Sequence, residues 1–428
     1  MAIEDILNQV ITDNEEKSNE QKIFVGAKTK KVSCNFDLDD ETLGVPNIKI
    51  FGVGGAGNNI VEYLGKLRNW PLNINFWALN TDKKTLIKFK KSQLNSSLFL
   101  IGEKKLKGFG SGGNPSIGRD AFTENKADVE KILSSKTDIL FIIAGLGKGT
   151  GSGVSPEIAK IARANNITTV GIVTVPSINV EGRKVYENSL ESYSELEKSC
   201  DSLCAISNEK IISTATETTF FDQLSKGNRE IGSTISDFVD IVTSAGKLNI
   251  DYHDLESFLK NNKYFFHTLI VLDKAYNYEK LNTLITDAIT KSYSNINFEL
   301  ADIEVIVNFK INSGTQSKLI EDTKNILERI SNNSNIKLIY GIEETSASDN
   351  VEISLFISNS HQMQQSSVVE KNSKTVNVKS LLENDAESPV SRIKHGDTTR
   401  ITRKLFDWDL DDDDEDQALT RALDNEKI

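Results

Sequence analysis

Hydrophobic residues in the first half of the chain fall into short continuous runs, separated by segments of helical periodicity. The apolar runs predicted as strands lie at residues 48–53, 74–82, 137–146, 167–177 and 201–208. Between them apolar positions recur at helical spacing, as in residues 60–67 and 156–166. Strands that are apolar throughout and alternate with helices predict a parallel sheet covered on both faces. We therefore expect an α/β, doubly wound domain over residues 47–222.

The second half of the chain has a different pattern. A long helical stretch at 221–244 leads into four further strand patterns interleaved with helical ones. The strand patterns lie at 267–273, 303–309, 336–342 and 351–358, and the helical ones at 278–291 and 316–330. The chain is thus predicted to have a long connecting helix and a second, smaller α/β domain. The expected parts are a disordered extension (1–46), the first domain (47–222), the connecting helix (223–246), the second domain (247–360) and a disordered acidic linker and tail (361–428).

Charge and cysteine content narrow the class of protein. Lys and Arg number 50 against 62 Asp and Glu, which gives a net charge of −12. This excess of negative charge disfavours contact with a phosphate backbone, so we expect no nucleic-acid partner. No apolar run is long enough to span a bilayer and the first residues lack a signal-peptide pattern, so we expect a cytoplasmic protein without direct membrane insertion. Cys200 and Cys204 are two of only three cysteines. We expect them one helical turn apart, and such a pair supplies too few ligands for a zinc site.

Three glycine-rich segments follow or separate the predicted strands. They are GVGGAG at 52–57, GFGSGGNPSIG at 108–118 and GLGKGTGSG at 145–153. Glycine turns at the carboxyl ends of neighbouring strands converge on one ligand, and the helix starts behind them offer N–H groups to phosphate. Three such loops predict a di- or triphosphate site. A dinucleotide oxidoreductase would account for the first loop and Asp82 but not for the other two, and Lys148 lacks the following Ser or Thr of a P-loop.

The order of these motifs resembles the tubulin/FtsZ family, and in particular its bacterial FtsZ branch, which builds the cell-division ring. GKGTGSG at 147–153 is similar to the family signature GGGTGSG, with one substitution. The other motifs in family order are GVGGAGNN at 52–59, LNTD at 79–82, GSGGNP at 110–115, VEGRK at 180–184, ISNEKI at 206–211 and KLNIDYHDL at 247–255. The similarity covers roughly residues 47–360. It implies the tubulin/FtsZ fold and a GTPase that assembles head to tail into filaments.

The resemblance implies a GTP or GDP site built from all these motifs, with Mg²⁺ accompanying the phosphates. The matching positions are Gly54, Gly55, Ala56, Gly57, Asn58, Asn59, Asp82, Gly110, Ser111, Gly112, Gly113, Gly147, Lys148, Gly149, Thr150, Gly151, Glu181, Val185, Asn208, Phe221 and Ser225. Within this set Glu181 would hold the ribose. Asn208 and Phe221 would flank the guanine.

The resemblance also implies an active site that is completed between adjacent subunits. The loop that one subunit would insert beside the γ-phosphate of the next carries Asn249, Asp251 and Asp254. Two carboxylates three residues apart can orient the attacking water and organise a cation, which suits a reaction that depends on positioning and charge neutralisation. The local sequence has a second interpretation, in which Asp251 caps a helix that starts at Tyr252 and Asp254 is favourable in its first turn. We expect both roles together.

Three positions depart from the family pattern. Val185 stands where the family places an arginine against the γ-phosphate, Ser225 where it places a guanine-reading aspartate, and Lys148 replaces a signature glycine. A serine cannot match a bidentate carboxylate. We therefore expect weaker base discrimination and slower turnover than is usual in the family, with Lys148 as a substitute positive charge. A filament scaffold with little or no GTPase activity stays an alternative, and a Rossmann-type oxidoreductase a more distant one.

The expected partners are further copies of this chain, in a head-to-tail homopolymer, and division or membrane-tether proteins. Residues 403–414, RKLFDWDLDDDD, form an acidic segment with aromatic residues, in a place similar to that where the family carries a partner-docking motif. The other interpretation of such an acidic run is a solvated, solubilising tail. We expect the protein to be concentrated at the division site.

Overall fold

The computed structural model describes residues 44–91, 96–214, 219–244, 246–273, 276–290, 303–312, 317–330, 336–345 and 350–359, together with residues 292 and 315. The predicted acidic linker and tail, and all but the last three residues of the predicted N-terminal extension, lie outside these residues. The five-part division of the chain therefore stays a prediction.

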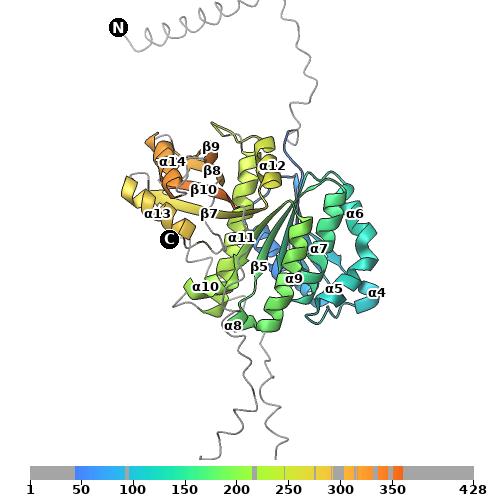
Figure 1. Ribbon diagram of the computed structural model, residues 1–428. Helices are drawn as coiled ribbons and strands as arrows, with labels where there is room; N and C mark the ends of the chain where they lie inside the picture. The colour runs from blue at the N-terminus through green and yellow to red at the C-terminus, as the bar shows by residue number, and fades with distance from the viewer. Residues whose placement is uncertain are drawn as a thin grey trace, which may run out of the picture. The chain divides into compact units, whose positions relative to one another are not determined.

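One ten-stranded sheet runs through the described residues in the order β3-β2-β1-β4-β5-β6-β7-β10-β8-β9 (Figure 1). Its first six strands are β1 (Ile48–Val53), β2 (Ile74–Asn80), β3 (Ser96–Leu100), β4 (Ile139–Gly145), β5 (Thr168–Val175) and β6 (Ser202–Ser207). All neighbouring pairs among these six are parallel. The order reverses between β1 and β4, as in doubly wound sheets, so the predicted fold class is confirmed.

The remaining strands extend the sheet with mixed directions. They are β7 (Tyr264–Asp273), β8 (Ile303–Ile311), β9 (Ile336–Glu344) and β10 (Asn350–Asn359). Strand β10 is antiparallel to both β7 and β8, whereas β8 and β9 are parallel. The two parts of the sheet meet at β6 and β7, which share one registered pair, Leu203 with Tyr264. By contrast, β6 pairs with β5 along its whole length.

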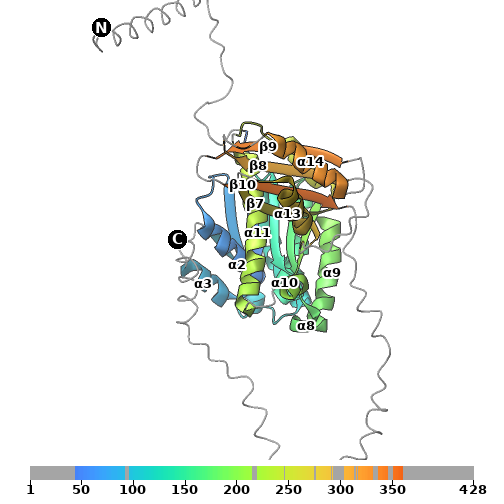
Figure 2. The ribbon, with the colours of Figure 1, turned by 90° about the vertical axis from the view of Figure 1, so that its left-hand side faces the viewer.

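Helices cover both faces of the sheet. One face of the first six strands carries α2 (Gly54–Leu67), α3 (Lys83–Lys91), α10 (Asn208–Thr214), α11 (Phe220–Thr243) and α12 (Tyr252–Asn261). The other carries α5 (Pro115–Phe122), α6 (Lys126–Ser134), α7 (Gly149–Ala164) and α9 (Arg183–Ser199). Helices α13 (Tyr278–Thr290) and α14 (Lys318–Ile330) pack on β7, β8 and β10 (Figure 2). Two short helices, α4 (Glu103–Leu106) and α8 (Ile178–Glu181), complete the connections between them.

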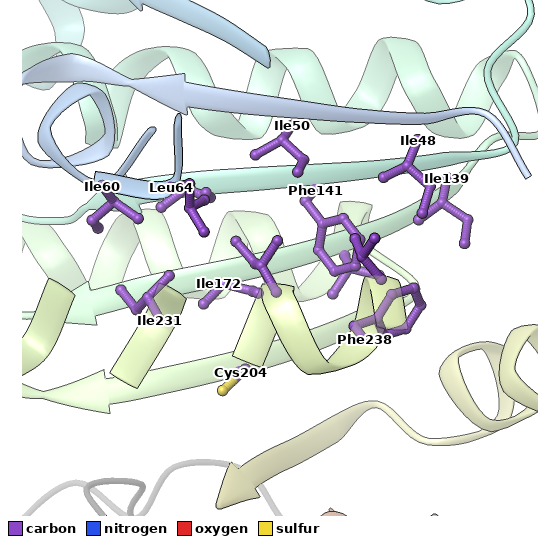
Figure 3. Packing of buried hydrophobic residues seen from close by; sticks show 14 of the residues in the cluster. Ile48, Ile50, Ile60, Leu64, Ile139, Phe141, Ile172, Cys204, Ile231 and Phe238 are labelled. Carbon is purple, nitrogen blue, oxygen red and sulfur yellow. The ribbon is translucent and has the colours of Figure 1, made fainter. Parts of the chain in front are cut away.

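The continuous apolar runs are explained by these two covered faces. Along β4, Phe141 points into the core shared with α2 and α11, whereas Leu140 and Ile142 point into the core shared with α5 and α7. Figure 3 shows the first of these cores, where Phe141 meets Phe238 of α11 with ring centroids 4.8 Å apart. Every side chain of the strand is therefore removed from water, which favours apolar residues at successive positions.

Helix α11 corresponds to the predicted connecting helix. Its 24 residues span about 36 Å at 1.5 Å per residue. It starts with a capping box, in which Thr219 and Asp222 each accept a hydrogen bond from the other's backbone N–H. In Figure 1 it runs from the end of the molecule with α10 to the end with α12. It thereby links the two ends of the parallel strands.

Three details of the expected elements were wrong or incomplete. Strand β3 was missed, because SSLFL is short and not bounded by clear turn signals. Helix α7 begins at Gly149 rather than at 156, since the glycines of the signature adopt helical geometry. Cys200 and Cys204 are not one helical turn apart: Cys200 follows α9, Cys204 lies on β6, and they belong to cores on opposite faces of the sheet. Burial raises the pKa of the Cys200 thiol to about 12.

Candidate functional site

Two glycine motifs touch where the strand order reverses. Strand β1 passes directly into α2 at Gly54, and β4 leads through residues 146–148 into α7. Gly54 has φ +76°, and a Cβ atom there would lie 2.9 Å from the backbone nitrogen of Gly151. Only glycine allows both this left-handed backbone and this close approach of the two backbone segments. The site predicted from the glycine loops is therefore formed by backbone at the carboxyl ends of neighbouring strands.

Both helices that begin here lack a side-chain cap. The N-cap residues are Val53 for α2 and Lys148 for α7, and neither makes a side-chain cap hydrogen bond within the described residues. Elsewhere Asn114 caps α5 by accepting a hydrogen bond from Ser116 N at 2.9 Å. The first N–H groups of α2 and α7 therefore have no such acceptor, and they point from the positive ends of two helix dipoles. This arrangement suits a phosphate group.

A buried hydroxyl cluster joins three of the predicted segments. Thr81, directly after β2, has its Oγ1 atom 2.7 Å from Oγ1 of Thr150 on α7. Ser111 of the second glycine-rich segment lies 3.4 Å from the same Thr150 oxygen. All three side chains are less than a tenth exposed. The cluster holds the predicted residues Ser111 and Thr150 in one place, next to the start of α7.

The loop that carries Ser111 also contacts the end of β2. Gly110 N donates to Thr81 O at 3.1 Å, and Gly112 and Gly113 are exposed beyond it. Asp82 accepts hydrogen bonds from Lys84 N and Thr85 Oγ1 at 2.8 and 2.9 Å. Its carboxylate thus caps α3. The acid at this position is therefore accounted for by helix capping.

The first turns of α2 present different groups to solvent and to the interior. Gly55, Ala56 and Asn59 are exposed, whereas Gly57 and Asn58 are buried. The Asn58 amide nitrogen donates to Gly52 O at 2.8 Å, and its oxygen accepts from Asn80 at 2.7 Å. The predicted residue Asn58 therefore supports the glycine turn with its side chain.

The residue predicted for the ribose, Glu181, contacts one of those predicted for the base, Asn208. Asn208, the first residue of α10, donates from Nδ2 to Glu181 Oε2 at 3.2 Å. The same oxygen accepts from Ser177 N at 3.1 Å. Ser225 is exposed on α11, while the side chain of Phe221 is outside the described structure. The structure thus brings Glu181 and Asn208 into contact and leaves the position of the Phe221 side chain as a prediction.

Val185 packs beneath the signature loop. Gly147 has φ +102°, and a Cβ atom there would lie 2.5 Å from Cγ1 of Val185. Asn188 of the same helix, α9, donates to Gly147 O at 3.2 Å, and Gly147 N donates to Ser152 Oγ at 2.6 Å. At the position where the tubulin/FtsZ family is expected to carry arginine, this chain thus places the apolar side chain of Val185 against Gly147. Lys148, in contrast, is exposed.

The acidic loop lies at the other end of the same strands. Asp251 caps α12 by accepting a hydrogen bond from His253 N at 3.3 Å, and Asp254 stands in the first turn, as expected. Thr168, the first residue of β5, donates to Glu256 of α12 at 3.2 Å. Helix α12 therefore packs at the amino ends of the parallel strands, whereas the glycine loops follow their carboxyl ends. Figure 1 shows α12 at one end of the molecule and α8 and α10 at the other.

The predicted site residues therefore form two groups that cannot meet within one chain. The first group, from the glycine loops to Asn208, follows the carboxyl ends of β1, β2, β4, β5 and β6. The second, Asn249, Asp251 and Asp254, is exposed at the amino ends.

Comparison with known proteins agrees with this geometry. Residues 47–216 match the family described as Tubulin/FtsZ family, GTPase domain. These residues are thus similar to a tubulin/FtsZ GTPase domain. The chain is 35% identical over 218 residues to the cell division protein FtsZ of Buchnera aphidicola subsp. Baizongia pistaciae, which covers 51% of this chain and 54% of that protein. It is 31% identical over 293 residues to the cell division protein FtsZ of Porphyromonas gingivalis, covering 67% of this chain and 60% of the relative. The matches thus span little more than half the length of these relatives.

Solved structures show the same fold for a larger part of the chain. An empty FtsZ dimer from M. jannaschii matches with a TM-score of 0.63 and 24% identity, covering 73% of this chain and 88% of that chain. A GTPγS-bound protofilament of CetZ2 from Haloferax volcanii matches with a TM-score of 0.63 and 16% identity, covering 76% and 96%. The predicted tubulin/FtsZ fold is confirmed.

Some supporting residues of the candidate site were not predicted. Thr81 and Ser152 lie inside the LNTD and signature motifs, so small hydroxyl residues within those motifs were the available signal. Asn188 has no signal, because its role depends on how α9 packs against Gly147. Among the described residues no group of three or more His, Cys, Asp or Glu side chains could hold a metal ion, and no helix is long and apolar enough to cross a membrane.

Proposed function

We propose that the protein binds GTP at the glycine-loop end, polymerises head to tail and hydrolyses GTP where the acidic loop of one subunit meets the nucleotide of the next. One observation carries the proposal: a site rich in backbone donors and a loop of exposed carboxylates lie at opposite ends of the same parallel strands. Stacking copies in one direction brings the two together. The relatives' name, cell division protein, supports a filament that forms the cell-division ring.

The phosphates would bind at the starts of α2 and α7. The backbone of residues 54–57, 111–113 and 148–151 would supply N–H groups around this position, and two helix dipoles favour negative charge there. The N–H groups of Gly110 and Gly147 are bonded within the protein and support the loops. Mg²⁺ fits this arrangement as an ion that the phosphate oxygens and water coordinate, since Mg²⁺ commonly keeps several waters and takes few protein ligands. Glu181 would bind the ribose. Asn208, Phe221 and Ser225 would contact the base.

Hydrolysis would need only a positioned water and neutralised charge. Asp251 uses one oxygen to cap α12, so its other oxygen is directed away from that bond and can accept a hydrogen bond from the attacking water. Asp254 and Asn249 provide further acceptors on the same exposed loop. The site that performs the reaction would then exist only between subunits.

The measurement that tests this is phosphate release against protein concentration, with GTP and ATP in parallel and filament formation followed by sedimentation. We expect a GTP-dependent rate per subunit that rises steeply above a threshold concentration. A rate per subunit independent of concentration would contradict a site shared between subunits. Comparable affinities for GTP and ATP are expected from Ser225, which offers the base a single hydroxyl; a strong preference for GTP would contradict this.

A second candidate is a nucleotide-gated filament scaffold with little or no turnover. Val185 favours it, because its apolar side chain under Gly147 adds no positive charge beside the phosphates. Filaments that sediment in GTP without phosphate release at any concentration would select this function. In both cases the partners are further copies of the chain and, through the C-terminal tail, division or membrane-tether proteins at a cytoplasmic division site.

A further inference from the structure

A cluster of charged side chains connects α11 to the strands beneath the acidic loop. It consists of Arg68, Asp237, Asp240, His267 and Lys310, which we call the charge cluster. Lys310 of β8 lies between its two carboxylates, with Nζ 2.5 Å from Asp240 Oδ2 and 3.9 Å from Asp237 Oδ1. Its side chain is four-fifths buried, and those of both aspartates are at least nine-tenths buried.

The cluster ties α11 to both sides of the molecule. Arg68, at the end of α2, forms an ion pair with Asp240 Oδ1. On the other side His267 Nε2 of β7 lies 2.8 Å from Asp237 Oδ2, and Ser354 Oγ of β10 donates to that oxygen at 2.8 Å. Helix α11 therefore contacts three strands of the second part of the sheet through charged or hydroxyl groups.

The acidic loop is seated directly beside this cluster. Leu248 N donates to Ile342 O at 3.2 Å, and Ile342 N donates to Leu248 O at 2.8 Å. The next residue of β9, Glu343, is the registered partner of Lys310 on β8. A small cavity under the loop is lined by Asp240, Asn249 and Glu343 among others. The strand segment that holds the loop and the cation that holds α11 are thus immediate neighbours.

The charge on Lys310 is held by the two buried carboxylates. Burial opposes its ionisation, but the carboxylates of Asp240 and Asp237 outweigh burial and raise the pKa of the ammonium group. Nearby, burial raises the pKa of Glu343. Arg68 Nε and Glu343 Oε2 are buried without a hydrogen-bond partner in the described part of the chain. Removing the lysine would leave Asp240 with Arg68 alone and Asp237 with His267 alone. Two buried carboxylates would each lose a cation, so the surrounding segments would have to move or admit water.

We propose that Lys310 is a positioning residue for Asn249, Asp251 and Asp254: through Asp240 of α11 and Glu343 of β9, it fixes the acidic loop in the orientation in which it enters the neighbouring subunit's site. The consequence for turnover rests on the proposed function. The seating of the loop is a property of the single chain and can be measured without nucleotide.

The test is amide hydrogen exchange on the full chain, comparing Lys310→Met with the original sequence. We expect the Leu248 and Ile342 amides to exchange about tenfold faster or more, with the amides of residues 149–160 unchanged, because the loop opens locally. Lys310→Arg keeps the charge and should restore protection. Lys337→Met is the matched control, since Lys337 is an ion-paired lysine at the opposite end of the same strand pair, with Glu304 as its partner.

A second variant keeps the proposal testable if Lys310→Met does not fold. Asp240→Asn combined with Lys310→Met removes both charges, so no orphaned carboxylate remains at position 240, and we expect the same fast exchange at Leu248. Unchanged protection at Leu248 and Ile342 in either folded variant, or a uniform loss across the chain, would overturn the proposal. In turnover assays we expect a lower kcat with an unchanged KM for GTP. If the original chain does not hydrolyse GTP, the proposed hydrolysis fails while the exchange result still decides the role of Lys310.

Discussion

At the carboxyl ends of β1 and β4 two helices begin without a side-chain cap, whereas at the amino ends of the parallel strands α12 begins under the carboxylate of Asp251. The first end offers backbone donors and the second offers acceptors. Each is unremarkable chemistry for a helix start, yet the two are complementary only when a second molecule is added. The proposed reaction thus depends on two opposite features: the free backbone N–H groups at the starts of α2 and α7, and the carboxylates at the start of α12.

The comparison can be broken most directly at Asp251. Asn caps helices as well as Asp does, so Asp251→Asn removes the charge and keeps the cap. We expect GTP turnover to fall by about 100-fold or more, the scale seen when a transition-state contact is lost, with thermal stability and GTP affinity unchanged. Asp273→Asn, at the exposed end of β7, is the matched control. Weaker GTP binding by Asp251→Asn in the monomer would mean that the two ends are not separate.

The charge cluster, which lies between the two ends, can be tested through Asp237. Burial opposes its ionisation, but the hydrogen bond and charge of His267, with Lys310, outweigh burial and lower the pKa of Asp237 below its usual 3.8. A carboxyl whose pKa is lower in the folded than in the unfolded state stabilises the fold at pH values above its unfolded-state pKa. This stabilisation is lost as the pH falls from the unfolded-state pKa through the folded-state pKa. We expect Asp237→Asn to cost about 3 kcal/mol at pH 7, the scale for breaking a buried pair, and less as the pH approaches 3.

Urea unfolding at both pH values measures this difference. Asp273 again provides the control, because its pair with Lys280 is exposed on the surface. If Asp237→Asn lowers the free energy of unfolding equally at pH 7 and pH 3, the carboxylate charge does not stabilise the fold.

The donor end can be weakened at Gly54. Gly54→Ala places a Cβ atom 2.9 Å from Gly151 N on a left-handed backbone, so the contact between the two glycine motifs must open. We expect a loss of about 1–3 kcal/mol of stability and GTP binding weakened about tenfold or more, measured by calorimetry. The control is Gly227→Ala in α11, where the added Cβ meets only the end of the Ile211 side chain at 3.2 Å. Equal GTP affinity in both variants would show that GTP binding does not depend on the contact between Gly54 and Gly151.

The smallest expected effect concerns Lys148. It is exposed at the start of α7, so its charge acts through solvent and should contribute about 0.5–1 kcal/mol to phosphate binding. Lys148→Ala should weaken GTP binding or turnover two- to fivefold at low salt and less at high salt. Lys131→Ala on α6 makes the same charge change elsewhere on the surface. An unchanged Lys148→Ala variant would refute the idea that this lysine replaces the missing arginine.

Much of the structure at the glycine-loop end could be predicted, because the residues that form it lie close together in the sequence. The glycines and small hydroxyls of residues 147–153 lie in one short segment, and β1 and β4 are apolar runs long enough to be recognised. Asp251 was predicted as a cap from its position before Tyr252, and the structure confirms it. In contrast, β3 has too few residues to stand out, and the start of α7 was hidden because glycine is a poor helix former in isolation.

The charge cluster could not have been predicted from the sequence. Lys310 and Asp240 are 70 positions apart, and Arg68 and Asp240 are 172 apart. Each is an ordinary charged residue in a chain rich in charge, and only the packing of α11 against β8 places them together. Long-range pairs of this kind leave no periodic or motif signal.

The single registered pair between β6 and β7 has a mechanical consequence. A ladder of one rung resists shear far less than the full ladder between β5 and β6. A filament that is bent or pulled would therefore transmit its load across this seam through α11 and through the side-chain and backbone bonds at the seam, such as Leu203 N to Lys263 O at 2.8 Å. We expect the β6–β7 junction to separate first when the subunit is under tension, while the sheet up to β6 and the sheet from β7 onward stay intact.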